Sequence, residues 1–295
     1  MTLPIGINPL TWTNDDMPEL GGDTPLAVCL SEARRAGYDG MELGNKFPRD
    51  AAVLAPIMAA NALKIASGWY SANLLERSVD AEMAAMRPHL DLLRAMGSTA
   101  MVFAETTGCV HGDRKATLGT RRKLSATEMR DLGAKMTELG TRMDAQGVRL
   151  AYHHHMGTVI ETEAEIDALM AATGPSVGLL LDTGHLTYAG GDPLAVAKRH
   201  AARIAHVHCK DIRAATLAKA RAADLSFLDS VLDGVFTVPG DGCVAYPPIF
   251  AELKRAGYKG WLVVEAEQDP AKAHPFTYAK MGHDYLRREA AAAGL

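Results

Sequence analysis

The chain has few cysteines and no long apolar run, and both features limit the classes of protein to which it can belong. The four cysteines are scattered through 295 residues without a CxxC spacing, which argues against a disulfide scaffold or zinc knuckle and favours a reducing, cytoplasmic setting. No apolar run approaches the roughly 20 residues of a membrane helix. The first residues lack the basic and apolar regions of a signal peptide. We therefore expect a cytoplasmic protein without membrane insertion.

Basic runs and a phosphate-binding turn are also missing. The net charge is −4, with 31 basic and 35 acidic residues mixed along the chain. A nucleic-acid surface needs clustered lysine and arginine, so we expect no nucleic-acid partner. The first predicted strand is followed by Asn8-Pro-Leu-Thr-Trp12 rather than by the glycine-rich turn of dinucleotide-binding folds.

Short apolar segments alternate with amphipathic ones along the whole chain. Strands are predicted at residues 5–9, 40–43, 63–69, 99–103, 148–152, 177–181, 204–208 and 261–265. Ser125 with Glu128 and Thr162 with Glu165 read as capping boxes that start two of the intervening helices. Strands that are apolar on both faces and separated by helices indicate a parallel sheet. Eight such units predict an α/β fold, a single (β/α)8 TIM barrel over residues 1–295, with an open doubly wound sheet as the alternative.

Ionisable residues follow the ends of four consecutive predicted strands. They are His153-His-His155 with Glu161 after the fifth, Asp182-Thr-Gly-His185 after the sixth, His206-Val-His-Cys-Lys210 at the seventh and Glu265 at the eighth. The carboxyl ends of barrel strands carry the active site, so these side chains should share one face. Carboxylates with an imidazole suit Mn²⁺, Mg²⁺, Co²⁺ or Fe²⁺. Each residue alone could be a helix cap or a satisfied core histidine, whereas together they predict a metal site. Of His206 and His208, only one is expected to face the barrel axis.

Several longer motifs carry a resemblance to a known family. They are Gly6-Ile-Asn-Pro-Leu-Thr-Trp12, Met41-Glu-Leu-Gly-Asn-Lys-Phe-Pro48, the His153 and Asp182 segments above, His206-Val-His-Cys-Lys-Asp-Ile-Arg213, Gly234-Val-Phe-Thr-Val-Pro-Gly-Asp-Gly242 and Val264-Glu-Ala-Glu-Gln-Asp-Pro270. The chain resembles the xylose-isomerase-like barrel superfamily of sugar isomerases, epimerases and dehydratases. Within it, the chain is most similar to the inosose (2-keto-myo-inositol) dehydratase family of inositol catabolism.

The resemblance implies one divalent metal, Mn²⁺ or Co²⁺, at the carboxyl-terminal mouth of the barrel. Asp182, His208 and Glu265 match the superfamily ligands. The strand-five ligand is assigned to Glu161, with His153 or His155 as the alternative. Glutathione has been associated with the family, although no motif here identifies a site for it.

The implied reaction is the loss of water from 2-keto-myo-inositol to give a trihydroxycyclohexane-1,2-dione, catalysed by a hydro-lyase. A carboxylate, Glu265 or Glu161, would remove the proton next to the ketone, and an acid would protonate the leaving hydroxyl. The candidate acids are His185, His155 and Lys210. The candidate substrate-binding residues are Trp12, Glu42, Lys46, His153 and Arg213.

Other functions remain open from the sequence. A metal-dependent ketose or sugar epimerase or isomerase would share the metal and the deprotonation but not the water loss. An abasic-site endonuclease would need several metals and a basic groove, and a non-catalytic sugar-binding barrel would retain the metal without turnover. Residues 214–244 are too long for an ordinary loop and predict a lid that contains a short helix. The partner is expected to be a cyclic polyol ketone, and a homo-oligomer is possible.

Overall fold

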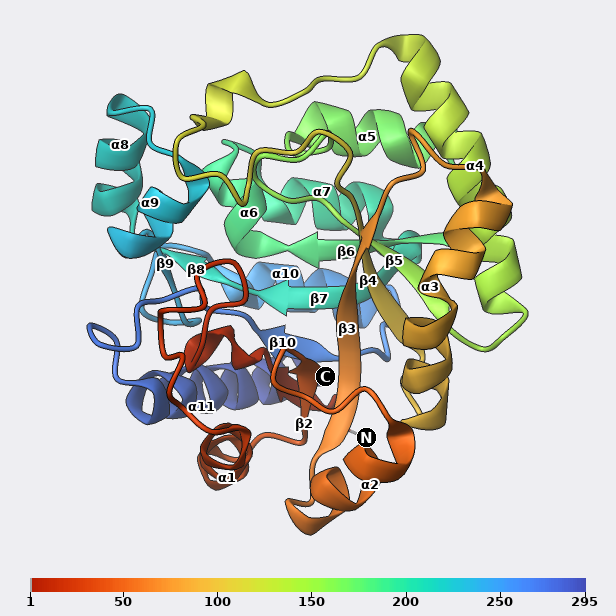
Figure 1. The fold of residues 1–295 in the computed structure, drawn as a ribbon. Coiled ribbons are helices and arrows are strands. Elements are labelled where there is room, and N and C mark those ends of the chain that lie inside the picture. The colour runs from red at the N-terminus through yellow and green to blue at the C-terminus, as the bar shows by residue number, and fades with distance from the viewer. Residues whose placement is uncertain (1) are drawn as a thin grey trace.

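Eight parallel strands form a closed barrel in the computed structural model, which describes residues 2–295 (Figure 1). Around the barrel the order is β1, β10, β7, β6, β5, β4, β3, β2. The strands are β1 (Ile5–Ile7), β2 (Gly40–Leu43), β3 (Lys64–Ala72), β4 (Ala100–Glu105), β5 (Arg149–His153), β6 (Val177–Asp182), β7 (Ile204–Cys209) and β10 (Leu262–Val264). The predicted TIM barrel is confirmed. Residue 1, which the predicted domain includes, lies outside the described residues.

Helices surround the barrel and connect its strands. They are α1 (Leu26–Ala36), α2 (Ala51–Ala60), α3 (Val79–Ala95), α4 (Ala126–Asp144), α5 (Glu163–Ala172), α6 (Thr183–Tyr188), α7 (Pro193–His200), α8 (Ala214–Ala222), α9 (Phe227–Leu232), α10 (Tyr246–Arg255) and α11 (Pro275–Ala293). Both predicted capping boxes are present, at Ser125 and at Thr162. Among residues 2–295, no helix has the length and apolar character to cross a membrane.

The segment at 214–244 is more structured than the sequence indicated. The predicted short helix is α9, but α8 precedes it, and β9 (Phe236–Thr237) pairs antiparallel with β8 (Asp211–Ile212). Helix α8 was missed because alanine dominates it and only Leu217 and Ala220 are buried, which leaves no clear apolar stripe. Figure 1 shows α8 and α9 beside the ends towards which β6 and β7 point.

Helix α4 lies unusually close to the end of α5 because of two glycines. A Cβ atom on Gly133 would overlap the carbonyl of Ala172, and one on Gly140 would lie 2.8 Å from the carbonyl oxygen of Ser176. Both glycines are buried on the face that packs inward. These positions require glycine because it has no side chain, and not because of its conformational freedom. A helix interior otherwise disfavours glycine.

Gly133→Ala should therefore destabilise the protein although alanine is the better helix former by about 1 kcal/mol. Overpacking against a backbone carbonyl costs about 1–3 kcal/mol, and urea unfolding measures the difference. Ala134, exposed on the same helix, provides the control, because Ala134→Gly tests helix propensity alone. A Gly133→Ala variant more stable than the parent would contradict this account of the α4 contact.

Candidate metal centre

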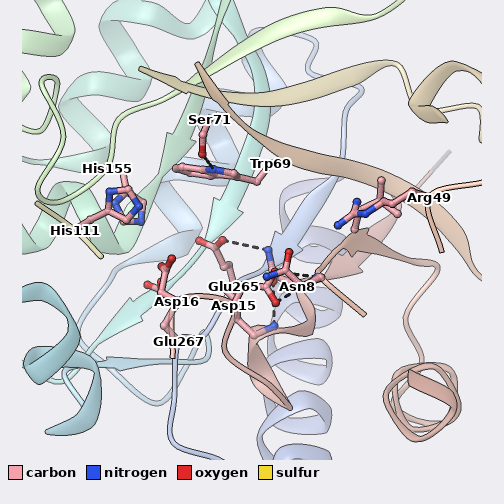
Figure 2. Close-up of a pocket in the computed structure, with 13 residues that line it drawn as sticks. Asn8, Asp15, Asp16, Arg49, Trp69, Ser71, His111, His155, Glu265 and Glu267 are labelled. Atoms are coloured by element: carbon pink, nitrogen blue, oxygen red, sulfur yellow. Dashed lines mark hydrogen bonds between the residues drawn. The ribbon is translucent and has the colours of Figure 1, made fainter. Parts of the chain in front are cut away.

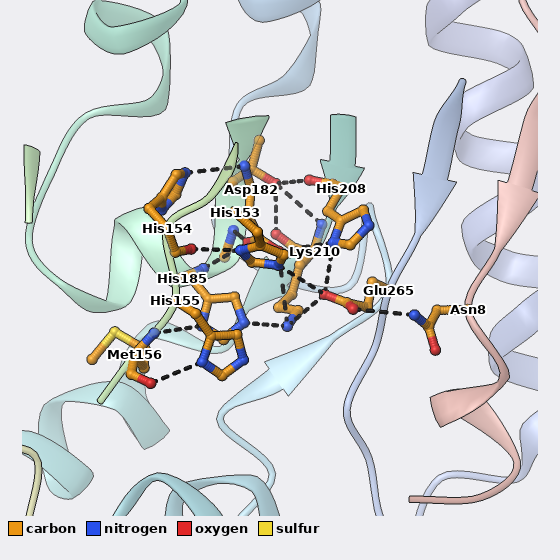
Figure 3. A network of polar contacts seen from close by, with 12 residues as sticks. Asn8, His153, His154, His155, Met156, Asp182, His185, His208, Lys210 and Glu265 are labelled. Atoms are coloured by element: carbon orange, nitrogen blue, oxygen red, sulfur yellow. Dashed lines mark hydrogen bonds and ion pairs between the residues drawn. The ribbon is translucent and has the colours of Figure 1, made fainter. Parts of the chain in front are cut away.

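Four buried side chains from neighbouring strands meet at the carboxyl-terminal end of the barrel (Figure 3). His153 ends β5, Asp182 ends β6, His208 lies in β7, and Glu265 follows β10 directly. One nitrogen or oxygen atom from each lies within 4.8 Å of the corresponding atoms of the other three. The shared register of parallel strands explains this convergence, since each residue stands at the same level of the barrel.

His153 and Asp182 are each fixed by backbone groups on the side away from the cluster. Asp182 caps α6, where its Oδ1 accepts hydrogen bonds from the amides of Gly184 (2.8 Å) and His185 (2.7 Å). The Nδ1 of His153 lies 2.7 Å from the carbonyl oxygen of His154, so this nitrogen carries the proton. The cap leaves Oδ2 of Asp182 free, and the tautomer leaves a lone pair on Nε2 of His153.

His208 and Glu265 are oriented by side chains instead. The Nε2 of His208 lies 3.1 Å from Oε2 of Glu42, and Nε2 of His206 lies 2.8 Å from Oε1 of the same carboxylate. Asn8 donates from its amide to Glu42 (2.9 Å) and to Oε1 of Glu265 (3.2 Å). Both histidines thus reach Glu42, and the expectation that only one faces the axis is wrong, because residues two apart share a face of a strand.

Each of the four clustered side chains has one further nitrogen or oxygen atom, and these four atoms point towards one another. They are Nε2 of His153, Oδ2 of Asp182, Nδ1 of His208 and Oε2 of Glu265. Within residues 2–295 the first three have no hydrogen-bond partner, whereas Oε2 of Glu265 also forms an ion pair with Nζ of Lys210 at 2.8 Å. Nδ1 of His208 lies 3.0 Å from Oε2 of Glu265 and 3.5 Å from Oδ2 of Asp182. Buried polar atoms are normally paired. Two imidazole nitrogens and two carboxylate oxygens that converge in this way form a donor set for a divalent metal.

Positively charged neighbours keep the buried carboxylates of the cluster ionised. Burial alone would raise the pKa of Glu265, but His208 and Lys210 hold it well below its usual value. Burial likewise opposes ionisation of Glu42, and His208 and His206 outweigh it to keep the pKa of Glu42 very low. These buried carboxylates are ionised at neutral pH, and Glu265 and Glu42 in turn raise the pKa of His208 against the effect of its burial.

Glu161, the predicted strand-five ligand and alternative base, lies outside the cluster. Its Oε2 accepts a hydrogen bond from the amide of Gly157 (2.8 Å) and pairs with Nε of Arg121 at 3.2 Å. The turn that follows β5 directs Glu161 to this arginine, which also holds Glu165 at 2.8 Å. Glu161 therefore lies apart from the cluster, and His153, the alternative left open, is the strand-five residue within it.

The predicted acids form a second group beside the first. Nζ of Lys210 lies 2.7 Å from Nε2 of His185, 2.6 Å from Oε2 of Glu267 and 2.8 Å from Oε2 of Glu265. Glu267 was not among the predicted site residues. Its position two residues after Glu265 was a usable signal, because alternate residues of an extended segment face the same side.

Burial determines the protonation states of the histidines and of Glu267 in this second group. It lowers the pKa of His155 and of His185 well below the usual range, and the nearby positive groups add to the effect, so both rings are neutral at pH 7. Nδ1 of His155 lies 2.8 Å from the carbonyl oxygen of Met156 and carries the proton. Burial raises the pKa of Glu267 to about 7, against the lowering effect of Lys210.

A cavity of about 260 Å³ opens beside the two groups (Figure 2). Glu265, Glu267 and His155 form part of its wall, and Trp69 closes one side. The Trp69 ring packs edge-on against His153 and His155, with 5.4 Å between centroids in each case. Further polar lining residues are Asn8, Asp15, Asp16, Asn45, Arg49, Ser71 and His111. A mostly polar wall with one aromatic face suits a small polyhydroxylated molecule.

Two predicted substrate-binding residues point away from this cavity. The Trp12 indole donates to Glu32 at 2.6 Å and is buried against the helices. Nζ of Lys46 donates to the carbonyls of Gly22 (2.6 Å) and Thr24 (2.5 Å) and so fixes the loop before α1. The direction of a side chain after a strand end depends on the loop path, which strand prediction does not supply.

Arg213 and Glu42 also lie outside the lining of this cavity. Arg213 binds Asp241 (2.7 Å) and the carbonyl of Gly234 (2.9 Å), and thereby holds the two ends of the 214–244 segment together. Glu42 lies behind His208 and not in the cavity wall. Of the predicted substrate-binding residues, His153 belongs to the four-residue cluster, and Glu42 forms a neighbouring ligand-type group with His206 and His208.

Residues 30–289 match the profile of a family described as xylose isomerase-like TIM barrel. The chain belongs to this family. Among xylose isomerase-like relatives, the rhizopine catabolism protein MocC of Rhizobium meliloti is 56% identical over 100% of this chain and 90% of its own length. The inosose dehydratase of Geobacillus thermodenitrificans is 45% identical over 96% of each chain. The similarity to inosose dehydratases that the motifs indicated is confirmed.

Solved structures of this barrel family share the fold at low identity. A probable 3-DHS dehydratase, AsbF from Bacillus anthracis, has a TM-score of 0.69 at 13% identity, with 97% of this chain and 99% of AsbF covered. The IOLI protein, in a crystal structure with a zinc atom, has a TM-score of 0.71 at 16% identity, with 99% of each chain covered. These similarities concern the barrel architecture.

The two assignments for the strand-five ligand can be separated by calorimetry with Mn²⁺. His153→Ala should weaken binding by more than about 100-fold, because loss of a partner behind a ligand already costs about 10–100-fold. Glu161→Gln should leave the affinity nearly unchanged, since its carboxylate pairs with Arg121. The reverse ranking of the two variants would restore Glu161 as the ligand.

Proposed function

We propose that this chain is a metal-dependent inosose dehydratase, a hydro-lyase that converts 2-keto-myo-inositol to a trihydroxycyclohexane-1,2-dione in inositol catabolism. The observation that carries the proposal is the set of four buried, converging ligand atoms beside a polar cavity. Full-length relatives at 41–45% identity bear the name inosose dehydratase and support the choice of substrate.

The proposed metal ligands are His153, Asp182, His208 and Glu265, and the proposed ion is Mn²⁺ or Co²⁺. Nitrogen and oxygen donors without thiolate suit these ions. A bound divalent cation supplies charge that offsets the negative oxygen formed when a proton leaves the carbon next to a ketone. The other polar atoms of these four side chains are held by Asn8, Glu42 and backbone groups, which orients the donor atoms towards one another.

Two groups on the cavity wall can accept the α-proton. Glu265 borders both the ligand cluster and the cavity, and its Oε1 is held by Asn8 at 3.2 Å. His155 is neutral and has committed its Nδ1 proton to Met156, so that its Nε2 is an acceptor. The same tautomer makes His155 a poor proton donor, which favours its use as an acceptor or as a hydrogen-bond partner of a substrate hydroxyl.

Glu267 is the proposed donor to the leaving β-hydroxyl. It lines the cavity, and behind it Lys210 and His185 form a hydrogen-bonded relay. Protonation lets the hydroxyl leave as water, and the resulting enol ketonises to the dione. Assistance of this kind is worth about 10²–10⁴-fold. The predicted acids His185 and Lys210 then act through Glu267, since both are completely enclosed.

The reaction product distinguishes the proposed dehydratase from the alternative, a ketose epimerase or isomerase in the same barrel. Protein treated with a chelator should be inactive on 2-keto-myo-inositol, and Mn²⁺ or Co²⁺ should restore formation of an ultraviolet-absorbing dione. Protein stripped of metal and still fully active would refute the metal requirement. An epimerised ketose formed without dione would establish the alternative.

The proposed lid is the segment at 214–244. In support, the Phe227 ring lies 4.9 Å from the His155 ring and 5.6 Å from the His185 ring. Phe236 lies 5.5 Å from His185, and Nζ of Lys210 lies 5.0 Å from its centroid. An apolar cover strengthens electrostatic stabilisation of an enolate by keeping water out.

Phe227→Ala should lower turnover by at least about 10-fold, because water gains access to the reacting ring, while Mn²⁺ affinity stays within about 3-fold. Leu217→Ala is the matched control: Leu217 is buried in the same apolar cluster as Phe227 but does not pack on the histidines. Equal losses of turnover in the two variants would show that the segment acts through stability alone.

Two further expectations stay predictions. The family resemblance suggests glutathione as an additional cofactor, and the sequence allows a homo-oligomer. Activity measured with and without glutathione, and the mass in solution by light scattering, test them independently of the metal centre.

A further inference from the structure

A second set of ligand-type residues lies against the first and has no metal-binding role in the function proposed above. It consists of His155 after β5, His185 in the first turn of α6, and Glu267 after β10. One ligand atom from each lies within 4.8 Å of the others, and all three residues are buried. By composition and spacing, this set could hold a divalent ion as well as the first could.

The second set is already filled by a cation of the chain itself. Nζ of Lys210 lies 2.7 Å from His185 and 2.6 Å from Glu267, and also 2.8 Å from Glu265, which belongs to the first set (Figure 3). The Lys210 side chain is fully enclosed. Its ammonium group therefore stands among the atoms that a second metal would use.

The residues around Lys210 leave room for its aliphatic side chain. A Cβ atom on Gly184 would overlap Cγ of Lys210 and come within 2.7 Å of its Cβ and Cδ, so a glycine is required where the stem passes. The Phe236 ring lies 5.0 Å from Nζ on another side. A compact ammonium with three donors fits a site of one imidazole and two carboxylates.

We propose that Lys210 is a built-in cation that takes the place of a second metal ion, so that the centre binds one metal only. The inference rests on the metal-binding part of the proposed function. Glu265 is the shared residue: one of its oxygens faces both the first cluster and Nζ of Lys210. The ammonium supplies the second positive charge that Glu265 and Glu267 require, and it does so without exchange with solvent.

Removal of the ammonium should open a second metal site. Lys210→Ala is dialysed against Mn²⁺, and bound metal per chain is measured together with the electron paramagnetic resonance spectrum. The expected result is two ions per chain in the variant against one in the parent, with a spin-coupled signal from ions that share Glu265. Adding His185→Ala to the variant should return the count to one.

Lys272→Ala is the matched control, because Lys272 is an exposed lysine bound to the carbonyl of Leu232 in the proposed lid. It should bind one ion, like the parent. One ion with an unchanged spectrum in Lys210→Ala, or two ions in the parent, would overturn the inference about Lys210. No ion in the parent would instead refute the metal centre of the proposed function.

A second variant keeps the test informative if Lys210→Ala does not fold. Lys210→Ser leaves a smaller void with room for water, and both variants are also refolded with excess Mn²⁺. Recovery of folded protein with two ions per chain supports the inference, because the metal replaces the lost charge. Failure of both variants to fold in Mn²⁺ counts against it.

Discussion

The carboxylate of Glu42 is the contact on which the centre depends. It extends from β2 into the barrel and accepts hydrogen bonds from both histidines of β7 and from Asn8 after β1. By engaging Nε2 of His208 it turns Nδ1 towards the cluster, and through Asn8 it also steadies Glu265. One buried anion thus sets the direction of two ligand-type side chains, which is the usual work of a carboxylate behind a metal-bound histidine.

Sequence patterns predicted the barrel and three members of the cluster for the same reason. Apolar runs of five or six residues mark buried parallel strands, and ionisable residues at the ends of several consecutive runs, as at Asp182 and Glu265, indicate a shared site. The level of these residues in the barrel follows from the strand, so their meeting could be predicted. Contacts such as Asn8 with Glu265, 257 residues apart, could not.

The directions of side chains in loops could not be predicted from the sequence. Glu161 stands eight residues beyond β5, and the path of that turn sends it to Arg121. Lys46 is long and flexible, and it is drawn to the free carbonyls near Gly22 rather than to the cavity. Trp69 was overlooked as an ordinary apolar strand residue, because β3 extends to Ala72 and carries the ring to the mouth of the barrel. Periodicity reports burial, and it does not distinguish a core face from a cavity wall.

The pairing of β1 with β10 has a consequence for the order of events during synthesis. The first strand leaves the ribosome more than 250 residues before its partner β10, and the edges at β1 and β7 both stay open until Leu262–Val264 emerges. Glu265 emerges immediately afterwards, so the same few residues close the sheet and complete the cluster. Until then the nascent chain holds unpaired edges and a partial set of ligand-type groups. Bringing such distant segments together is the slow, entropically costly step in barrels of this kind. A ribosome stalled before residue 262 would thus carry a chain that is almost full length and still lacks a barrel.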